Sequence, residues 1–271
     1  MTSPTGGAAS SPETPRQEWQ IDVGKDKTSA VLEAATTDGD GTVFVCAHGA
    51  GGHMADRGML KLAEVFRARG LDVVRFNFLY RERKSGRPDA MPRLQECFSA
   101  VVAHTLKEVQ PKRLIIGGRS MGGRAASMMA AEGFTCDGLL LLAYPLHPPG
   151  QPEKLRDAHL SAIKVPVLCL NGTRDAFCRR ELMDAALKTV TTRWEMHWLE
   201  GADHSFHVPK SSGRTDAQVL EEIGDATKLW IATFASITEG VTHAADLTDE
   251  ANRSAIGTDQ SMETRLRPKM K

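Results

Sequence analysis

Ser120 lies at the centre of a G-x-S-x-G pentapeptide, residues 118–122. A short apolar run precedes the pentapeptide at residues 114–116, and a run of small residues with helical spacing follows it at 125–131. This order predicts a strand, a sharp turn and a helix, with the serine at the tip of the turn. The flanking glycines let the neighbouring strand and helix come close. A serine at this position lies beside a helix N-terminus at the carboxyl end of a strand, which favours a nucleophile for acyl transfer.

An aspartate and a histidine that could activate this serine follow two later predicted strands. A serine hydroxyl is a poor nucleophile unless a base takes its proton, and that base works best when a third group fixes its orientation. Asp175 follows the apolar run at residues 165–170, and His204 follows the run at 194–199. Because parallel strands end at one edge of their sheet, we expect both side chains near Ser120. The predicted triad has Ser120 as the nucleophile, His204 as the base and Asp175 as the orienting acid.

Other assignments of the acid and the base stay open from the sequence alone. Taken singly, Asp175 is typical of a helix N-cap or a turn, and His204 is typical of a surface loop. Asp203 is a rival acid, but adjacent side chains diverge, so it could not easily reach the far ring nitrogen of His204. His207 is a rival base that lies farther from the strand end. Three suitable residue types at three appropriate strand ends favour the first assignment.

A glycine-rich loop supplies a second feature of acyl-transfer sites. The apolar run at residues 42–47 leads into a histidine and then into Gly-Ala-Gly-Gly at residues 49–52. Glycines there let the loop bend in beside the nucleophile, so the backbone N–H groups of Ala50 and Met121 are predicted to form an oxyanion hole. A phosphate-binding loop is the alternative, but neither G-x-G-x-x-G nor G-x-x-x-x-G-K-[ST] is present. We expect a structural hydrogen-bonding role for His48.

The loops at the same edge of the sheet indicate the kind of substrate. About 20 residues separate the strands that end near residue 143 and begin near 165, which is too few for a lipase-like cap of several helices. The residues that we expect to contact the substrate are Tyr80, Arg81, Arg119 and His147. Arginine suits the paired hydrogen bonds of a carboxylate or a phosphate. A small, polar or anionic substrate is therefore expected, with a solvated charged rim as the alternative.

Strands and helices must alternate to position these groups. Apolar runs predict strands at residues 42–47, 71–78, 114–116, 137–143, 165–170 and 194–199, and an antiparallel edge pair at 19–23 and 28–34. Helices are predicted from near residue 59 and at 92–109, 125–131, 179–189 and 215–236, with a polar loop at 80–88. The inward face of the last helix is predicted to hold Val219, Leu220, Ile223, Leu229, Trp230 and Phe234. The fold class is α/β, a mostly parallel, doubly wound sheet with helices on both faces and no large cap.

Composition excludes several classes of function. Lys plus Arg and Asp plus Glu number 34 each, so no net charge attracts nucleic acid or an anionic membrane surface. No apolar run approaches the ~18 residues of a membrane span, and the N-terminus lacks the pattern of a signal peptide. The five cysteines are widely spaced without a C-x-x-C pair, which is typical of reduced thiols and gives no sign of a metal or redox cofactor. We expect a cytoplasmic protein that needs no cofactor and acts on a small molecule.

One domain is expected between two tails. With 41% hydrophobic residues among 271, the chain can bury a sizeable core, which we place at residues 17–236. Residues 1–16 are rich in Thr, Ser, Pro, Gly and Ala without a period that could bury a face, so we expect disorder there. Residues 237–271 lose the apolar periodicity and end in a mildly basic stretch. They are predicted to form a second, flexible tail.

Several segments together resemble a known family. They are the elbow at residues 117–124, Tyr-Pro-Leu-His-Pro-Pro-Gly at 144–150, Lys-Leu-Arg-Asp at 154–157 and Gly-Ala-Asp-His-Ser at 201–205. They resemble the α/β-hydrolase-like family that includes a testis-expressed protein and a subunit of the NSL histone-acetyltransferase complex. Predicted bacterial hydrolases and, more distantly, dienelactone hydrolases are similar. The resemblance covers roughly residues 42–236 and implies an α/β-hydrolase fold with the triad predicted above, in the chain order of that fold. It implies no established substrate.

Two functions from different classes remain. The first is a serine hydrolase that cleaves an ester, thioester or related acyl bond of a small molecule. The second is a non-catalytic adaptor that binds a protein partner on a retained hydrolase fold, since one branch of the resembling family looks like a scaffold subunit and fold alone does not settle function. All three residue types of the triad are present, and the chain is far shorter than a complex-building scaffold. Both observations favour the enzyme.

Overall fold

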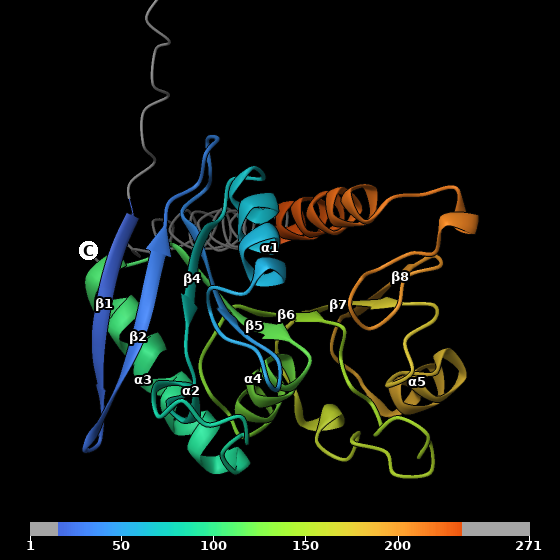
Figure 1. Cartoon of the computed structure of the whole chain (residues 1–271), viewed down its shortest axis with the longest axis horizontal. Coiled ribbons are helices and arrows are strands. Elements are labelled where there is room, and N and C mark those ends of the chain that lie inside the picture. The colour runs from blue at the N-terminus through green and yellow to red at the C-terminus, as the bar shows by residue number, and fades with distance from the viewer. Residues whose placement is uncertain (1–15, 235–271) are drawn as a thin grey trace, which may run out of the picture. The chain divides into compact units, whose positions relative to one another are not determined.

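The computed structural model of the chain describes residues 16–234 (Figure 1). The two predicted tails lie outside the described residues, apart from Arg16, which begins the first strand. The chain divides into two compact units, residues 1–227 and 228–271. The first unit holds all the strands described below, and the described part of the second is the end of the last helix. No helix within residues 16–234 combines the length and apolar character that a membrane crossing needs.

A single sheet of eight strands in the order β1-β2-β4-β3-β5-β6-β7-β8 forms the centre of the first unit. The strands are β1 Arg16–Val23, β2 Asp26–Glu33, β3 Thr42–Ala47, β4 Asp72–Phe76, β5 Arg113–Arg119, β6 Gly138–Leu142, β7 Val167–Gly172 and β8 Trp194–Leu199. β2 pairs antiparallel with both β1 and β4, and all other neighbours are parallel. The carboxyl ends of the six parallel strands β3 to β8 therefore meet at one edge of the sheet.

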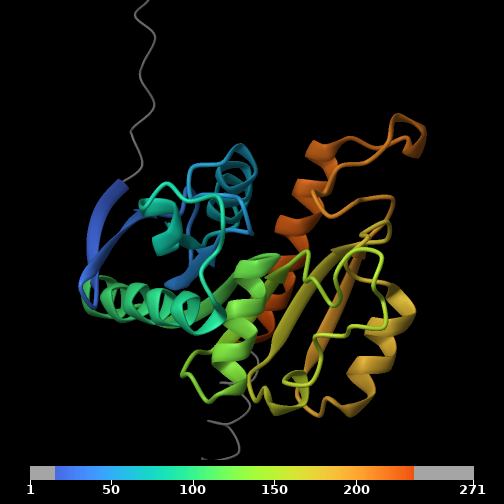
Figure 2. The same ribbon diagram turned by 60° about the horizontal axis from the view of Figure 1, so that its bottom comes forward.

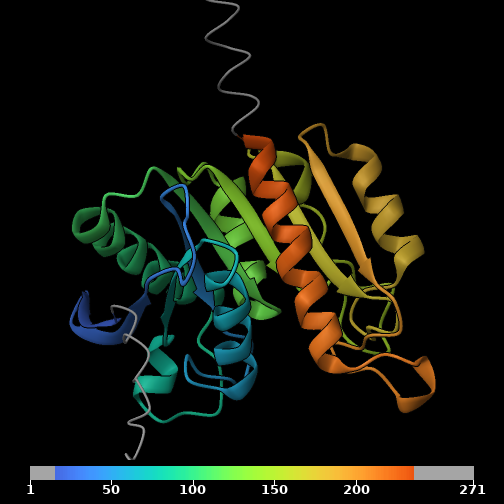
Figure 3. The ribbon, with the colours of Figure 1, turned by 90° about the horizontal axis from the view of Figure 1, so that it is seen from above.

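Helices cover both faces of this sheet, which explains why its central strands are apolar throughout. Every residue of β3, β6 and β7 is buried. The helices are α1 Arg57–Arg67, α2 Leu79–Glu82, α3 Met91–Val109, α4 Met121–Ala131, α5 Arg180–Ala186 and a last helix from residue 216. In Figure 2, α3, α4 and α5 lie in front of the sheet, and in Figure 3, α1 lies on the opposite face. The predicted doubly wound α/β fold is confirmed.

The start of the last helix packs directly against α1. Gly224 lies so close to that helix that a Cβ built on it would come within 2.5 Å of the Val65 side chain. Arg69, just beyond α1, pairs with Glu221 at 2.5 Å and with Asp225 at 3.0 Å. These contacts hold the start of the last helix against α1.

The structure differs from the predicted elements in a few local details. The predicted polar loop at residues 80–88 begins with the buried turn of α2, and the predicted helix 179–189 ends in a separate 3-10 turn at Leu187–Thr189. Leu229 was predicted to face inward but is 72% exposed. The physical reason is helical geometry, because six residues after the buried Ile223 the helix has turned by about 240°. All five cysteines are buried free thiols, as expected for reduced cysteines.

Candidate active site

Ser120 occupies a strained turn between β5 and α4. Its backbone has φ 51° and ψ −113°, a conformation that is costly for a residue with a side chain. The Ser120 N–H donates to the carbonyl of Leu142 at 2.8 Å, which ties the turn to the end of the neighbouring strand β6. The surrounding fold thus holds the serine in the geometry of a nucleophile elbow, with its hydroxyl directed away from the strand.

The glycines that follow Ser120 allow β5 and α4 to approach their neighbours. A Cβ built on Gly122 would lie 2.6 Å from the carbonyl oxygen of Ala47, at the end of β3. A Cβ built on Gly123 would lie 2.6 Å from the carbonyl oxygen of Gly118. Because backbone atoms cannot move aside cheaply, only glycine fits at these positions. This close packing brings the end of β3 and its glycine loop beside the serine.

His204 joins Ser120 and Asp175 in one chain of hydrogen bonds. Its Nε2 lies 2.9 Å from the Oγ of Ser120, and its Nδ1 lies 2.8 Å from Oδ2 of Asp175 and 3.0 Å from Oδ1. The carboxylate accepts only, so it holds the ring proton at Nδ1 and leaves Nε2 free to accept from the serine hydroxyl. The Asp175 side chain has no exposed surface, whereas that of His204 is 20% exposed. The arrangement can take a proton from Ser120 and stabilise the imidazolium that forms.

Two donors besides His204 satisfy the buried carboxylate of Asp175. The backbone N–H of Phe177 donates to Oδ1 at 2.8 Å, and the amide of Asn171 donates to Oδ2 at 3.3 Å. Asn171 is itself fixed by Tyr144, whose backbone N–H and C=O both bond to its side chain. Sequence reasoning did not identify Asn171, although a polar residue at the end of the apolar run of β7 was a signal. It restrains Asp175 from one side while His204 restrains it from the other.

The glycine loop after β3 lies against the nucleophile. A Cβ built on Gly49 would be 3.5 Å from the Cβ of Ser120. Met121 begins α4, so its N–H is one of the first helical donors that have no acceptor within the helix. Ala50 follows Gly49 in the loop. The structure thus places Met121 directly after Ser120 and the residue before Ala50 against Ser120, an arrangement in which the N–H groups of Met121 and Ala50 could stabilise a tetrahedral oxyanion.

His48 has the structural role expected of it. Its Nε2 accepts from the backbone N–H of Phe78 at 3.1 Å, so its proton is on Nδ1, which donates to the carbonyl of Gly49 at 2.8 Å. The side chain is fully buried, and burial lowers the pKa of His48 to about 4. The ring therefore stays neutral at pH 7 and anchors the glycine loop to Phe78, two residues after the end of β4.

Residues 40–232 match the model of a known family, the alpha/beta hydrolase domain. The chain belongs to the α/β-hydrolase family. The quorum-quenching protein AidA of Acinetobacter baumannii is 32% identical over 118 residues, which are 42% of this chain and 38% of that protein. The chain thus spans well under half the length of this curated relative. Family membership supports a hydrolase.

Solved structures of low sequence identity share the fold. An alpha-beta serine hydrolase homologue from Coxiella burnetii is 20% identical with a TM-score of 0.65, covering 78% of this chain and 96% of that one. A dienelactone hydrolase from Anabaena variabilis is 20% identical with a TM-score of 0.63, covering 82% and 98%. A serine hydrolase without a lid from Xanthomonas campestris is 21% identical with a TM-score of 0.64, covering 81% and 98%. The described part of this chain also has no large cap between β6 and β7, where the only helical element is a 3-10 turn at Leu160–Ala162.

Asp203 and His207, the rival acid and base, form hydrogen bonds that stabilise the loop after β8. Oδ1 of Asp203 accepts from the backbone N–H groups of Ser205 at 2.7 Å and His207 at 3.1 Å. The ring of His207 is 61% exposed and pairs with Asp216 at 3.0 Å. The pairing with Asp216 raises the pKa of His207. These contacts shape the turn that carries His204.

His147 and Tyr80, which we expected to contact the substrate, are enclosed by the protein. The backbone N–H of Arg179 donates to Nε2 of His147 at 3.2 Å, and Nδ1 bonds to the carbonyl of Pro148 at 2.9 Å. The His147 side chain is 1% exposed, so both of its nitrogens serve the backbone. Tyr80 is fully buried in α2, and burial raises the pKa of its phenol. Neither side chain offers a surface to a ligand in this conformation.

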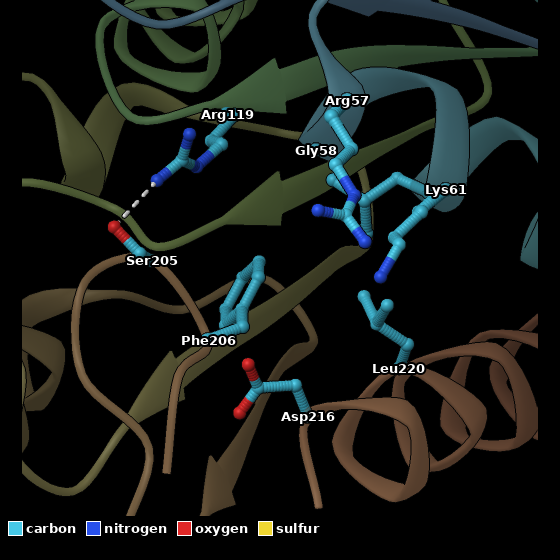
Figure 4. Close-up of a pocket in the computed structure, with 9 residues that line it drawn as sticks. Arg57, Gly58, Lys61, Arg119, Ser205, Phe206, Asp216 and Leu220 are labelled. Carbon is cyan, nitrogen blue, oxygen red and sulfur yellow. Dashed lines mark hydrogen bonds between the residues drawn. The ribbon is translucent and has the colours of Figure 1, made fainter.

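The two predicted arginines are only partly buried. Nη1 of Arg81 donates to the carbonyl of Ser85 at 3.2 Å, and its guanidinium carbon lies 6.0 Å from the centre of the Tyr80 ring. Nη2 of Arg119 donates to the carbonyl of His204 at 3.1 Å and to Oγ of Ser205 at 3.3 Å (Figure 4). Burial lowers the pKa of Arg119. Arg119 therefore links the turn that carries the nucleophile to the loop that carries His204.

Within residues 16–234, no group of three or more His, Cys, Asp or Glu side chains is placed to hold a metal ion.

Proposed function

We propose that this chain is a serine hydrolase that cleaves an ester, thioester or related acyl bond of a small molecule. The observation that carries the proposal is the unbroken hydrogen-bond chain from Asp175 through His204 to Ser120. These side chains come from loops after three different strands, and their contacts span 29 and 84 residues of sequence. Hydrogen-bond distances at both ends of one imidazole, together with the strained turn at Ser120, support a nucleophile with its base and orienting acid.

The proposed reaction proceeds through an acyl-enzyme. Nε2 of His204 takes the hydroxyl proton as Oγ of Ser120 attacks the carbonyl carbon of the substrate, and the carbonyl oxygen becomes an oxyanion. The N–H groups of Met121 and Ala50 stabilise this oxyanion. His204 then gives its proton to the departing alcohol or thiol. Water attacks the acyl group with His204 again as base, and the carboxylic acid leaves.

The open carboxyl edge of the sheet supports a small substrate. Within residues 16–234, the only helical element between β6 and β7 is a 3-10 turn, so this connection forms no helical lid with an apolar surface for long acyl chains. Arg81 and Arg119 remain proposed contacts for a polar or anionic substrate. Within the family, we propose a relation to dienelactone-hydrolase-like enzymes and to the branch of the testis-expressed protein, on the Tyr-Pro-Leu-His block at residues 144–150.

Labelling by a fluorophosphonate probe tests the proposal. The purified chain should react covalently at Ser120, and Ser120→Ala should remove the label. Ser127→Ala is a matched control, because Ser127 is a buried serine of α4 whose hydroxyl bonds to the carbonyl of Arg124 and to His159. Absence of label from the folded wild-type protein would reject the enzyme and favour the adaptor on the same fold.

A further inference from the structure

A cavity of about 340 Å³ lies between α1, the loop after β8 and the start of the last helix. Figure 4 shows the side chains that line it. Arg57, Lys61 and Arg119 supply three cationic groups, and Asp216 supplies the one carboxylate among the lining residues. The apolar part of the lining comes from Leu62, Phe206 and Leu220. Its volume suits a small molecule rather than a polymer or a long acyl chain.

The cationic side chains of this cavity have no paired carboxylate in the part of the chain that the structure describes. The side chains of Arg57 and Lys61 form no hydrogen bond or ion pair with any residue from 16 to 234, although Lys61 is near enough to Asp216 to lower the pKa of that carboxyl. Among the described residues, the Arg119 side chain donates only to an uncharged carbonyl and a hydroxyl. A partly buried guanidinium without a paired carboxylate is costly, and an anionic ligand would offset that cost.

The only carboxylate of the lining is already engaged. Both oxygens of Asp216 lie 3.0 Å from Nδ1 of His207, and the backbone N–H of Val208 also donates to it at 3.0 Å. Asp56, Asp175 and Asp203 act electrostatically on Arg119 from outside the lining. Each of these carboxylates has another partner: Asp56 pairs with His53 at 2.9 Å, Asp175 pairs with His204 at 2.8 Å, and Asp203 accepts from the backbone N–H of Ser205 at 2.7 Å. The cavity therefore keeps an excess of positive charge, in a protein whose sequence has no net charge.

The cavity lining includes one sequence neighbour of the proposed nucleophile and one of the proposed base. Arg119 directly precedes Ser120, and Ser205 directly follows His204. The hydrogen bonds from Arg119 to the His204 carbonyl and to Ser205 form part of the cavity wall. A ligand group held there would thus lie beside the backbone of both the nucleophile and the base.

We propose that this cavity binds a carboxylate or phosphate group of the substrate, so that the hydrolase prefers acyl compounds with an anionic group a few atoms from the scissile bond. The inference rests on the proposed function for its catalytic part. Arg57 and Lys61, which the sequence did not single out, determine this preference together with Arg119. The guanidinium of Arg57 can hold the two oxygens of one anionic group as a pair, while Lys61 contributes a point charge.

The test compares anionic and neutral esters of matched size. One pair is the p-nitrophenyl monoester of glutaric acid and p-nitrophenyl pentanoate, with the charge on the acyl part. The other pair is 4-acetoxybenzoate and 4-acetoxybenzamide, with the charge on the alcohol part. For each pair, the ratio of kcat/KM for the anionic over the neutral ester is measured in the full chain. The variants are wild type, Arg57→Gln with Lys61→Gln, and the control Lys107→Gln, an exposed lysine of α3.

We expect the ratio to fall about tenfold or more in the double variant for at least one pair, and to be unchanged in the control. Arg119 is left intact, because it also holds the loop of His204. If the double variant kept the wild-type ratio of kcat/KM for both ester pairs, the proposed anion site would be wrong, although the proposed hydrolase activity would not be contradicted.

A second measurement covers the case in which Ser120 fails to label and the proposed function itself is wrong. Calorimetric titration with glutarate and with inorganic phosphate reports binding without any turnover. Weaker binding of either anion to the double variant than to wild type and Lys107→Gln supports the site. Equal binding to all three proteins, or none to wild type, overturns it.

Discussion

The ring of Phe177 lies against the imidazole of His204, with the ring centroids 4.2 Å apart and the planes tilted by 30°. Phe177 is in turn held by His147, whose backbone N–H donates to the Phe177 carbonyl at 3.0 Å. The backbone N–H of Phe177 donates to the carboxylate of Asp175. One residue thus bonds to the proposed acid through its backbone and packs on the proposed base through its ring. Phe177 is a positioning residue that the sequence did not reveal.

Replacing Phe177 should therefore impair turnover more than binding. Phe177→Ala leaves one face of the imidazole without support, and a displacement of the base on the order of 1 Å can cost roughly 100-fold in rate. We expect kcat for a p-nitrophenyl ester to fall by about 10- to 100-fold with little change in KM. Phe177→Tyr should restore most of kcat, since the ring is kept. An unchanged kcat in Phe177→Ala would show that the contact does not position His204.

The effects of removing the Ser120 and His204 side chains on catalytic activity should not be additive. Ser120→Ala and His204→Ala should each nearly abolish hydrolysis of a short p-nitrophenyl ester, and the double variant should be little worse, because the members of a triad act as a unit. His207→Ala is the matched control, as its ring pairs with Asp216 at the surface. If His204→Ala kept most of the activity while His207→Ala lost it, the assignment of the base would be reversed.

Asp175→Asn should lower kcat by roughly 10⁴ without unfolding the protein. An amide can donate to the imidazole as well as accept, so it no longer fixes the ring proton on Nδ1. The neighbouring Asp203→Asn serves as control, because that carboxylate accepts only from backbone N–H groups of its own turn. Circular dichroism and steady-state kinetics are measured on both. Wild-type turnover in Asp175→Asn together with a large loss in Asp203→Asn would identify Asp203 as the acid.

Burial of His48 should make the stability depend on pH between about 6.5 and 4. The unfolded chain takes up a proton near the ordinary value of 6.5, but burial lowers the pKa of folded His48 to about 4. In this window the unfolded state binds more protons, so the free energy of unfolding is highest above pH 6.5 and falls as the pH drops towards 4. The loss due to His48 is about 3 kcal/mol.

Urea denaturation at pH 7.5 and pH 4.5 measures this dependence. His48→Gln removes the titrating group and should reduce the difference in unfolding free energy between the two pH values. Part of the difference should remain, because burial also lowers the pKa of His159. If His48→Gln showed the same difference in unfolding free energy between pH 7.5 and pH 4.5 as wild type, His48 would not be the source of the pH dependence.

Close packing at the elbow should make Gly122 sensitive to a single methyl group. The Cβ of Gly122→Ala would approach the carbonyl oxygen of Ala47 to 2.6 Å and its side chain to 2.7 Å, so β3 or α4 must shift. We expect a loss of about 1–3 kcal/mol in unfolding free energy. Gly58→Ala, on the open side of α1 with no atom within 4 Å, should be neutral or slightly stabilising. Equal stability of the two variants would contradict the packing argument.

The sequence by itself determined which strands precede the candidate catalytic residues. Apolar runs, glycine turns and helical periodicity are local signals, and they placed Ser120, Asp175 and His204 after three different strands. The doubly wound sheet followed from the alternation of those elements. Because parallel strands end at one edge of their sheet, the alternation of strands and helices in the sequence already implies that the three side chains lie close together.

Tertiary structure alone decided which neighbours support or surround those residues. Tyr80 and His147 looked like loop residues available to a substrate, but packing encloses both. Asn171, Phe177 and the Arg57–Lys61 side of the cavity carried no local motif. Their contacts join the ends of different strands and helices, so they depend on the strand register and on side-chain directions in three dimensions. A linear pattern records the period of each element, but not which side chain of one element meets which side chain of another.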